Sequence, residues 1–234
     1  MVEVEFPEYM GYDRTIAVFT PDGRILQVEY AKEAVKRGAT SLGMIFKDGV
    51  LLASVRIRNS RLMVPSIEKL FQIDDHAGAV ASGFLADARV LIQMARVRAQ
   101  MHKITYEEPE DIWSIARTLA DRIQYSTLIA GLRPFGVGIL IGGVDLTGSH
   151  IVEVDTAGMI FEWKAHSIGR GSVNAIKILQ QKWSEDLSEE EAVKLAWEIF
   201  EKTEKGFKEV DIAIIKGSEK YKVLSDEEIK KIVS

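Results

Sequence analysis

Cysteine is absent from the 234-residue sequence, and so is any long hydrophobic run. Without cysteine the chain cannot form disulfides, ligate zinc through sulfur or use a thiol as a nucleophile. The longest apolar stretch, residues 135–144, is interrupted by glycines and is shorter than the ~20 residues of a membrane-spanning helix. The acidic N-terminal segment lacks the apolar core of a signal peptide. We therefore expect a cytoplasmic protein that has no membrane partner.

Charge and histidine content exclude further classes of function. The chain carries 30 basic and 35 acidic residues, a formal net charge of −5, which argues against a nucleic-acid partner. Its histidines, at positions 76, 102, 150 and 166, do not have the spacing of metal ligands on one helix. Neither a Walker loop nor a G-x-S-x-G elbow is present. We expect no metal or cofactor, and the lack of a Pro/Gly/Ser-rich linker predicts one domain.

Hydrophobic periodicity predicts blocks of helices and blocks of strands. Helical spacing is found in residues 24–37, 84–102, 109–127, 172–183, 188–203 and in a last segment after residue 225. Strand-like alternation is found in residues 40–46, 50–57, 69–74, 77–82, 135–143, 149–155, 159–164 and 209–216. Because the two kinds of segment do not alternate one by one, the sequence predicts the α+β class, with antiparallel sheets covered by helices.

Turn and capping residues in the sequence predict where several helices and strands begin or end. The Asp48-Gly49 pair between two apolar runs predicts a β-hairpin. Gly38 is expected to be a left-handed cap at the end of the first helix, and Pro109 to lie in the first turn of the third. Ser188 and Ser225, each followed three residues later by glutamate, predict capping boxes at two further helices.

The N-terminal block is more specific than a turn followed by an amphipathic helix. Its segments are residues 11–14 (GYDR), 19–24 (FTPDGR) and 27–31 (QVEYA). This block resembles the N-terminal signature of proteasome α-subunits, in particular the archaeal type. Further segments similar to that family follow in order, at residues 65–70 (PSIEKL), 82–89 (SGFLADAR), 133–137 (RPFGV) and 165–169 (AHSIG).

The resemblance implies a four-layer αββα sandwich of the N-terminal-nucleophile hydrolase type, with an extra N-terminal helix. It implies a gate tail over residues 1–14 and a single domain over residues 15–234. Members of the family form seven-membered rings with other α-subunits, cap the catalytic β-subunits of a protease, and receive the C-terminal tails of activating ATPases. They gate substrate entry and do not cut. By resemblance, the gate residues are Tyr12, Asp13, Arg14, Pro21 and Tyr30, and the activator-binding residues are Lys69 and Gly38.

The start of the first strand bears on whether this chain cuts peptides. In the related β-subunits the nucleophilic threonine lies four residues before a glycine, and that position here, counted from Gly43, is Ala39. Thr40 is one residue late, so its side chain should point to the opposite face of the strand. The acidic residue that follows the hairpin in β-subunits is replaced by Val55, whereas Lys69 matches their catalytic lysine. The sequence therefore predicts no catalytic residue.

Two other hypotheses stay open at this point. One is a threonine peptidase subunit released by autolysis near Ala39 or Thr40, and the other is a stand-alone scaffold of the same fold. The chain also departs from the family at two places, which could alter contacts with neighbouring subunits. Residues 126–131 (STLIAG) replace the usual Y-T-Q-x-G-G. The exit of the hairpin, which in α-subunits too normally carries an Asp or Glu and a Lys, reads SVRIR at residues 54–58.

Overall fold

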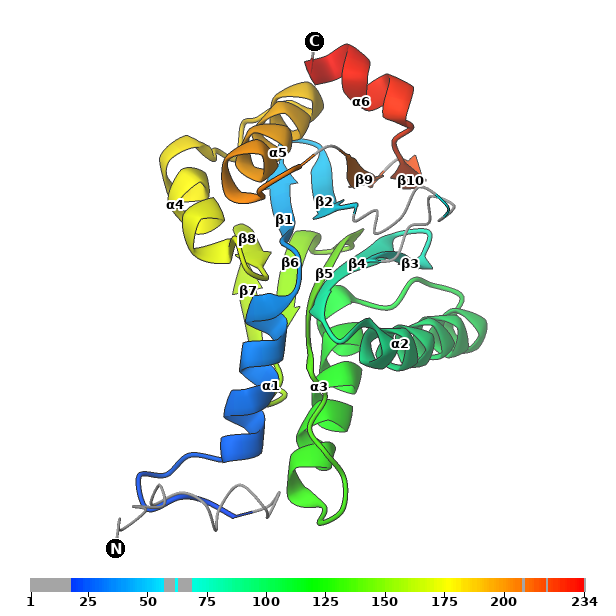
Figure 1. Ribbon diagram of the computed structural model, residues 1–234. Coiled ribbons are helices and arrows are strands. Elements are labelled where there is room, and N and C mark those ends of the chain that lie inside the picture. The colour runs from blue at the N-terminus through cyan, green and yellow to red at the C-terminus, as the bar shows by residue number, and fades with distance from the viewer. Residues whose placement is uncertain (1–17, 57–61, 63–68, 208, 218, 234) are drawn as a thin grey trace, which may run out of the picture.

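The computed structural model of the chain describes residues 18–56, 62, 69–207, 209–217 and 219–233. In these ranges the chain forms two five-stranded antiparallel sheets and six helices (Figure 1). The predicted α+β class, with antiparallel sheets covered by helices and an additional N-terminal helix, is confirmed. The expected gate tail, residues 1–14, lies outside the described residues.

Each sheet joins strands from distant parts of the sequence. The first sheet has the order β10-β9-β2-β1-β8, and the second has the order β3-β4-β5-β6-β7. The strands of the first sheet are β1 (Ser41–Phe46), β2 (Gly49–Val55), β8 (Ala165–Ile168), β9 (Val210–Lys216) and β10 (Glu219–Val223). The strands of the second are β3 (Leu70–Asp74), β4 (Ala77–Gly83), β5 (Val137–Asp145), β6 (Gly148–Val154) and β7 (Ile160–Trp163).

Six helices complete the described part of the chain. They are α1 (Leu26–Arg37), α2 (Leu85–Tyr106), α3 (Ile112–Leu128), α4 (Ser172–Lys182), α5 (Glu189–Thr203) and α6 (Asp226–Val233). Helices α2 and α3 share a buried apolar cluster with β4, β5 and β6, whereas α4, α5 and α6 share one with β1, β2 and β9. A third cluster lies between the two sheets. These clusters define the four layers that are visible in Figure 1.

Strand β2 shows how the sequence builds the layers. Side chains alternate along a strand, so Leu51 and Ala53 face the helices of the first sheet, while Val50 and Leu52 face the second sheet. All four are fully buried. The predicted hairpin is confirmed, because Phe46 pairs with Gly49 and the turn between β1 and β2 is only two residues long. Both faces of β2 therefore bury apolar surface, and its register with β1 is fixed.

The structure corrects several sequence-based expectations. Gly38 is extended, with φ −64° and ψ 152°, and is not a left-handed cap. Pro109 precedes α3, whose N-cap is Asp111, and the Asp111 side chain accepts a hydrogen bond from the Ser114 amide at 2.8 Å. Helix α2 ends at Tyr106, four residues later than predicted. Strands β8 and β10 were not predicted, because both are short edge strands that lack a run of apolar residues.

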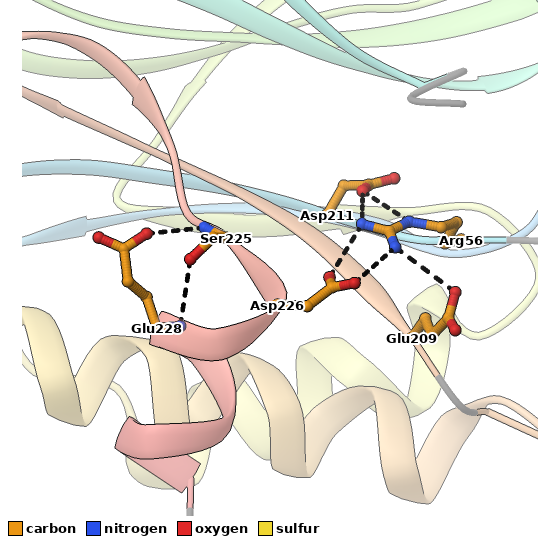
Figure 2. Close-up of polar contacts among 6 residues, drawn as sticks. All are labelled: Arg56, Glu209, Asp211, Ser225, Asp226 and Glu228. Atoms are coloured by element: carbon orange, nitrogen blue, oxygen red, sulfur yellow. Dashed lines mark hydrogen bonds and ion pairs between the residues drawn. The ribbon is translucent and has the colours of Figure 1, made fainter. Parts of the chain in front are cut away.

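Both predicted capping boxes are present. At α5, the Ser188 hydroxyl accepts a bond from the Glu191 amide, and the Glu191 carboxylate accepts one from the Ser188 amide. At α6, Ser225 and Glu228 make the same reciprocal pair, with distances of 2.7 and 3.2 Å (Figure 2). Each box satisfies donors that a helix N-terminus leaves unpaired, so it fixes where the helix begins.

Arg56 joins the end of β2 to the C-terminal part of the chain (Figure 2). Its Nε donates to Asp211 of β9 at 2.9 Å, and its Nη2 lies 3.2 Å from Asp226, the first residue of α6. Its Nη1 lies 3.4 Å from Glu209. Asp211 is only 2% exposed, and burial raises the pKa of its carboxyl in spite of the neighbouring guanidinium. Arg56 is therefore the cation that compensates the buried Asp211 carboxylate. It also attaches the start of α6 to the end of β2.

Replacing Arg56 by methionine should lower the free energy of unfolding by about 3 kcal/mol, because Asp211 would be left buried without its cation. Urea unfolding followed by circular dichroism measures the loss. The control is Lys220→Met, which removes an exposed ion pair with Asp75 and should cost less than about 1 kcal/mol. Equal effects of the two substitutions would show that Arg56 is not a structural anchor.

Candidate functional site

The candidate site lies where α1 ends and the chain enters β1. Gly38 occupies this junction, and its carbonyl accepts a hydrogen bond from the Arg170 amide at 2.8 Å. A Cβ atom at Gly38 would lie within 2.3 Å of the Ser82 hydroxyl and 2.4 Å of the Gly83 amide nitrogen. Glycine is thus required here by a close approach of two backbone segments, and not by a left-handed conformation.

The next residue is Ala39, and its carbonyl oxygen accepts hydrogen bonds from two side chains. The Lys69 ammonium donates to this carbonyl at 2.7 Å, and the Ser82 hydroxyl lies 3.1 Å from it. Lys69 is 6% exposed and Ala39 is 3% exposed. The structure therefore brings together Gly38 and Lys69, the two residues that the resemblance associates with activator binding, around the peptide group of Ala39.

Thr40 is held by a separate set of contacts. Its amide donates to the Glu204 carboxylate at 2.8 Å, and its hydroxyl donates to the same carboxylate. The hydroxyl also accepts a hydrogen bond from the Gly171 amide at 2.9 Å. Gly171 is the N-cap of α4 and Glu204 is the C-cap of α5, so one hydroxyl group joins the start of one helix to the end of another.

Glu204 is buried and charged. Burial alone would raise the pKa of its carboxyl, but the Arg170 guanidinium and the two Thr40 donors outweigh that effect, and the pKa is lowered. The Arg170 Nε donates to Glu204 at 2.7 Å, and the guanidinium forms an ion pair with the same carboxylate. The site therefore contains an ionised carboxylate whose hydrogen bonds hold Thr40 in place.

This arrangement provides no N-terminal nucleophile at the start of β1. Ala39, whose backbone carbonyl accepts a hydrogen bond from Lys69, has a methyl side chain with no oxygen to attack a carbonyl. The Thr40 hydroxyl is bound to Glu204, and the Thr40 nitrogen is a peptide amide, not a free amine that could act as a base. Val55, at the position of the acidic residue in β-subunits, is 6% exposed and packs among apolar side chains.

The predicted gate residues are only partly described. Tyr12, Asp13 and Arg14 lie outside the described residues. Pro21 lies in an exposed turn, in which the amide of Thr20 donates to the carbonyl of residue 24 at 2.8 Å. Tyr30 lies on α1 and is 53% exposed.

Two segments that carry the family resemblance meet in space. Both terminal nitrogens of Arg133 donate hydrogen bonds to the Asp87 carboxylate, at 2.6 and 2.7 Å. The Gly136 amide donates a third hydrogen bond to the same carboxylate, at 2.9 Å. Burial would raise the pKa of Asp87, but Arg133 and Gly136 lower it. This bidentate pair ties the start of α2 to the loop before β5, next to the C-terminal end of α1.

Sequence reasoning missed Glu204, Arg170 and Ser82 as parts of the site. Arg170 lies in a short glycine-flanked turn between β8 and α4, just after the segment 165–169 that carries the family resemblance. Glu204 gives no sequence signal, because it is one of several glutamates on and after α5. Its partner Thr40 lies 164 residues away in the sequence.

Replacing Thr40 by valine should lower the free energy of unfolding by about 1–3 kcal/mol, because Glu204 and the Gly171 amide would lose a buried partner. Chemical denaturation measures this loss. The matched control is Thr105→Val, which removes an exposed hydroxyl that bonds only within α2, to the Met101 carbonyl. The control should change the stability by less than about 0.5 kcal/mol, and a Thr40→Val protein as stable as the control would contradict this role of Thr40.

The lowered pKa of Glu204 predicts a dependence of stability on pH. Its carboxylate contributes fully above the unfolded-state value, 4.5, and the contribution is lost as the pH falls through the lower folded-state pKa. The difference in unfolding free energy between the wild type and Glu204→Gln should therefore shrink as the pH is lowered below about 4.5. A difference that stayed constant from about pH 7 to about pH 3 would show that Glu204 is not ionised in the folded state.

The described part of the chain lacks both a membrane-spanning helix and a cluster of metal-ligating side chains. In residues 18–56, 62, 69–207, 209–217 and 219–233, no helix is long and apolar enough to cross a membrane. Over the same ranges, no group of three or more histidine, aspartate and glutamate side chains could hold a metal ion.

Comparisons with known proteins identify the family. A family model described as "Proteasome subunit" matches residues 35–215, and a model of the N-terminal signature of A-type proteasome subunits matches residues 12–34. The chain is 46% identical to "Proteasome subunit alpha" of Methanothermobacter thermautotrophicus, over 94% of this chain and 91% of that protein. It is 47% identical to the protein of the same name from Pyrococcus horikoshii, over 97% of this chain and 89% of that protein. The chain therefore belongs to the proteasome subunit family, as a member of its alpha type.

Proposed function

We propose that this chain is a non-catalytic ring subunit of a proteasome core particle. The observation that carries the proposal is the environment of residues 39 and 40. The residue at the nucleophile position is alanine, and the neighbouring Thr40 hydroxyl is hydrogen-bonded to Glu204. The identity of the chain with alpha-type relatives supports the same role.

The geometry argues against the alternative of a self-processed threonine peptidase. Autolysis before Ala39 would free an amine on a residue without a nucleophile. Autolysis before Thr40 would free a threonine whose hydroxyl accepts from Gly171 and donates to Glu204. It would also remove the Ala39 carbonyl, to which Lys69 donates. In this proposal, helix α1 is a permanent part of the fold and not a propeptide.

In the proposed role, α1 contributes one face to the sandwich and another to neighbouring subunits. Only Val28 and Ala31 of its twelve residues are buried, and its buried face contacts β4 and β5. We propose that the remaining surface packs against adjacent α-subunits in a seven-membered ring, and that this ring caps the catalytic β-subunits. The assembled particle would act in the cytoplasm.

Gate opening in this proposal depends on the two ends of α1. Tyr12, Asp13, Arg14, Pro21 and Tyr30 would hold the N-terminal tail in one of two ordered states. Lys69 and Gly38, which lie together at the C-terminal end of α1, would receive the C-terminal carboxylate of an activating ATPase. Binding would open the gate if the activator had a higher affinity for the open state.

The first experiment records native mass spectra of the full chain, alone and mixed with a β-subunit, with a peptide-hydrolysis assay on each sample. The proposal predicts an intact chain of 26.2 kDa, a ring without activity, and an active particle only after β-subunits are added. A chain cut near residue 39 with activity of its own would favour the peptidase. An intact chain that never associates with β-subunits would favour a stand-alone scaffold.

Substitution of Tyr30 tests the gate in the mixed particle. Because Tyr30 is 53% exposed, Tyr30→Ala should change the stability of the subunit by less than about 0.5 kcal/mol. It should nevertheless lower the stimulation of peptide hydrolysis by the activating ATPase several-fold, while hydrolysis without the activator stays the same. The control is Tyr106→Ala, an exposed tyrosine at the end of α2. Normal stimulation of the Tyr30 variant would remove this residue from the gate.

A further inference from the structure

A pocket of about 280 Å³ opens between α1, strands β6 to β8 and the start of α4. Its apolar walls include Val35 of α1, Ile168 of β8 and Ile176 of α4. The pocket is lined by residues of one chain. Its volume is slightly below the range of drug-sized ligand sites, and it suits a group the size of one side chain.

The polar part of the pocket contains the Glu153 carboxylate, which forms no ion pair with a lysine or arginine among the described residues. Glu153 accepts the indole N–H of Trp163 at 2.9 Å, and its other close neighbour is the His166 Nε2 at 3.4 Å. The Trp163 ring stacks on the His166 ring with centroids 4.2 Å apart. Burial lowers the pKa of His166 to about 4, so His166 is neutral at neutral pH and does not compensate Glu153. Burial, followed by the charge of Asp155, raises the pKa of Glu153.

A second, independent feature of the pocket is an unsatisfied hydroxyl group. Thr156 lines the pocket and is 1% exposed, and its Oγ1 has no hydrogen-bond partner among the described residues. A buried hydroxyl without a partner costs free energy, and most such groups in proteins are satisfied by water or a ligand. This hydroxyl can accept a hydrogen bond from a ligand that carries several N–H donors.

The lysines that line the pocket are already paired on α1. The Lys32 ammonium lies 3.2 Å from Glu29, and the Lys36 ammonium lies 2.6 Å from Glu33. Both pairs lie along the helix surface at i,i+3 spacing and are well exposed. They therefore add little net charge to the pocket, which Glu153 and Asp155 also line.

We propose that this pocket binds a guanidinium group carried on a short alkyl chain, such as an arginine side chain. The apolar walls would contact the alkyl part, and the guanidinium would pair with Glu153 and donate to Thr156. A guanidinium fits better than an ammonium because it is more weakly hydrated, presents a fork of donors to a carboxylate and stacks on aromatic rings such as that of Phe161 at the same pocket.

A second glutamate with a tryptophan and a histidine as neighbours provides a matched control for Glu153. Glu162 accepts the indole N–H of Trp113 at 3.0 Å and pairs with His150 at 2.6 Å. It does not line the pocket, its side chain is 43% exposed, and its pKa is lowered, first by the hydrogen bond from His150. Glu162→Gln therefore repeats the chemical change of Glu153→Gln at a solvated carboxylate.

The test is calorimetric titration of the full chain with butylguanidinium and with its neutral isostere, butylurea. Butylguanidinium should bind and butylurea should not. Glu153→Gln should weaken binding by at least about 10-fold, because a charge-assisted bond is lost, whereas Glu162→Gln should leave the affinity within about 2-fold. Binding of the two ligands with equal affinity, or equal losses in the two variants, would overturn the proposal.

Two further measurements keep the test independent of folding defects in Glu153→Gln. Thr156→Val should leave the thermal stability of the free protein unchanged or slightly higher, because it removes an unsatisfied group, but should weaken binding about 5-fold. The affinity should also fall as the pH is lowered through the raised pKa of Glu153, with proton release on binding near that pH. The titratable groups at the pocket are Lys32, Lys36, Glu153, Asp155 and His166.

A last arm separates the sources of the ligand. If N-acetylarginine methylamide binds as well as butylguanidinium, the pocket accepts the arginine side chain of a polypeptide. If only butylguanidinium binds, the ligand is a free alkylguanidinium compound. Binding of acetate or inorganic phosphate in place of butylguanidinium would show that Lys32 and Lys36 make this an anion site, and would contradict the proposal.

Discussion

The hydrogen bonds between Thr40 and Glu204 fix the junction between α1 and β1, where the candidate functional site lies. One carboxylate holds both the amide and the hydroxyl of Thr40, and Arg170 keeps that carboxylate ionised despite its burial. One residue earlier, the backbone carbonyl of Ala39 accepts a hydrogen bond from Lys69. A slip of one residue would place a hydroxyl beside the lysine, but it would also break the buried hydrogen bonds of Thr40. The contacts of Thr40 therefore add to the register that the pairing of β1 with β2 sets, and they leave alanine, which has no nucleophilic group, as the residue whose carbonyl accepts from Lys69.

The sequence predicts the layers well because their signals are local and repeated. Apolar spacing places the helices and most strands to within a few residues, and the Asp48-Gly49 hairpin is confirmed. Local sequence patterns do not predict contacts between segments that are distant in the sequence. Gly38 is a glycine because Ser82 and Gly83 approach it, which no local pattern reveals. Glu204 was missed for the same reason, since its partner Thr40 lies 164 residues away, whereas the edge strands β8 and β10 were missed because they are short and lack an apolar run.

The departure from the family at residues 54–56 has a structural counterpart. The Ser54 hydroxyl is buried without a hydrogen-bond partner among the described residues, and Val55 packs into the apolar cluster under α5 and α6. Arg56 supplies the charged contact instead, through Asp211 and Asp226 (Figure 2). In this chain the end of β2 therefore anchors the C-terminal helix α6.

The most direct test of the central claim is the mass of this chain after exposure to a reagent specific for catalytic threonines. The complete particle, with its β-subunits, would be incubated with a peptide electrophile that reacts with N-terminal threonines, and the denatured subunits would be weighed. The account predicts that the β-subunits gain the mass of the reagent while this chain stays at 26.2 kDa and keeps its N-terminal helix. A shortened chain that carries the reagent on Thr40 would contradict it.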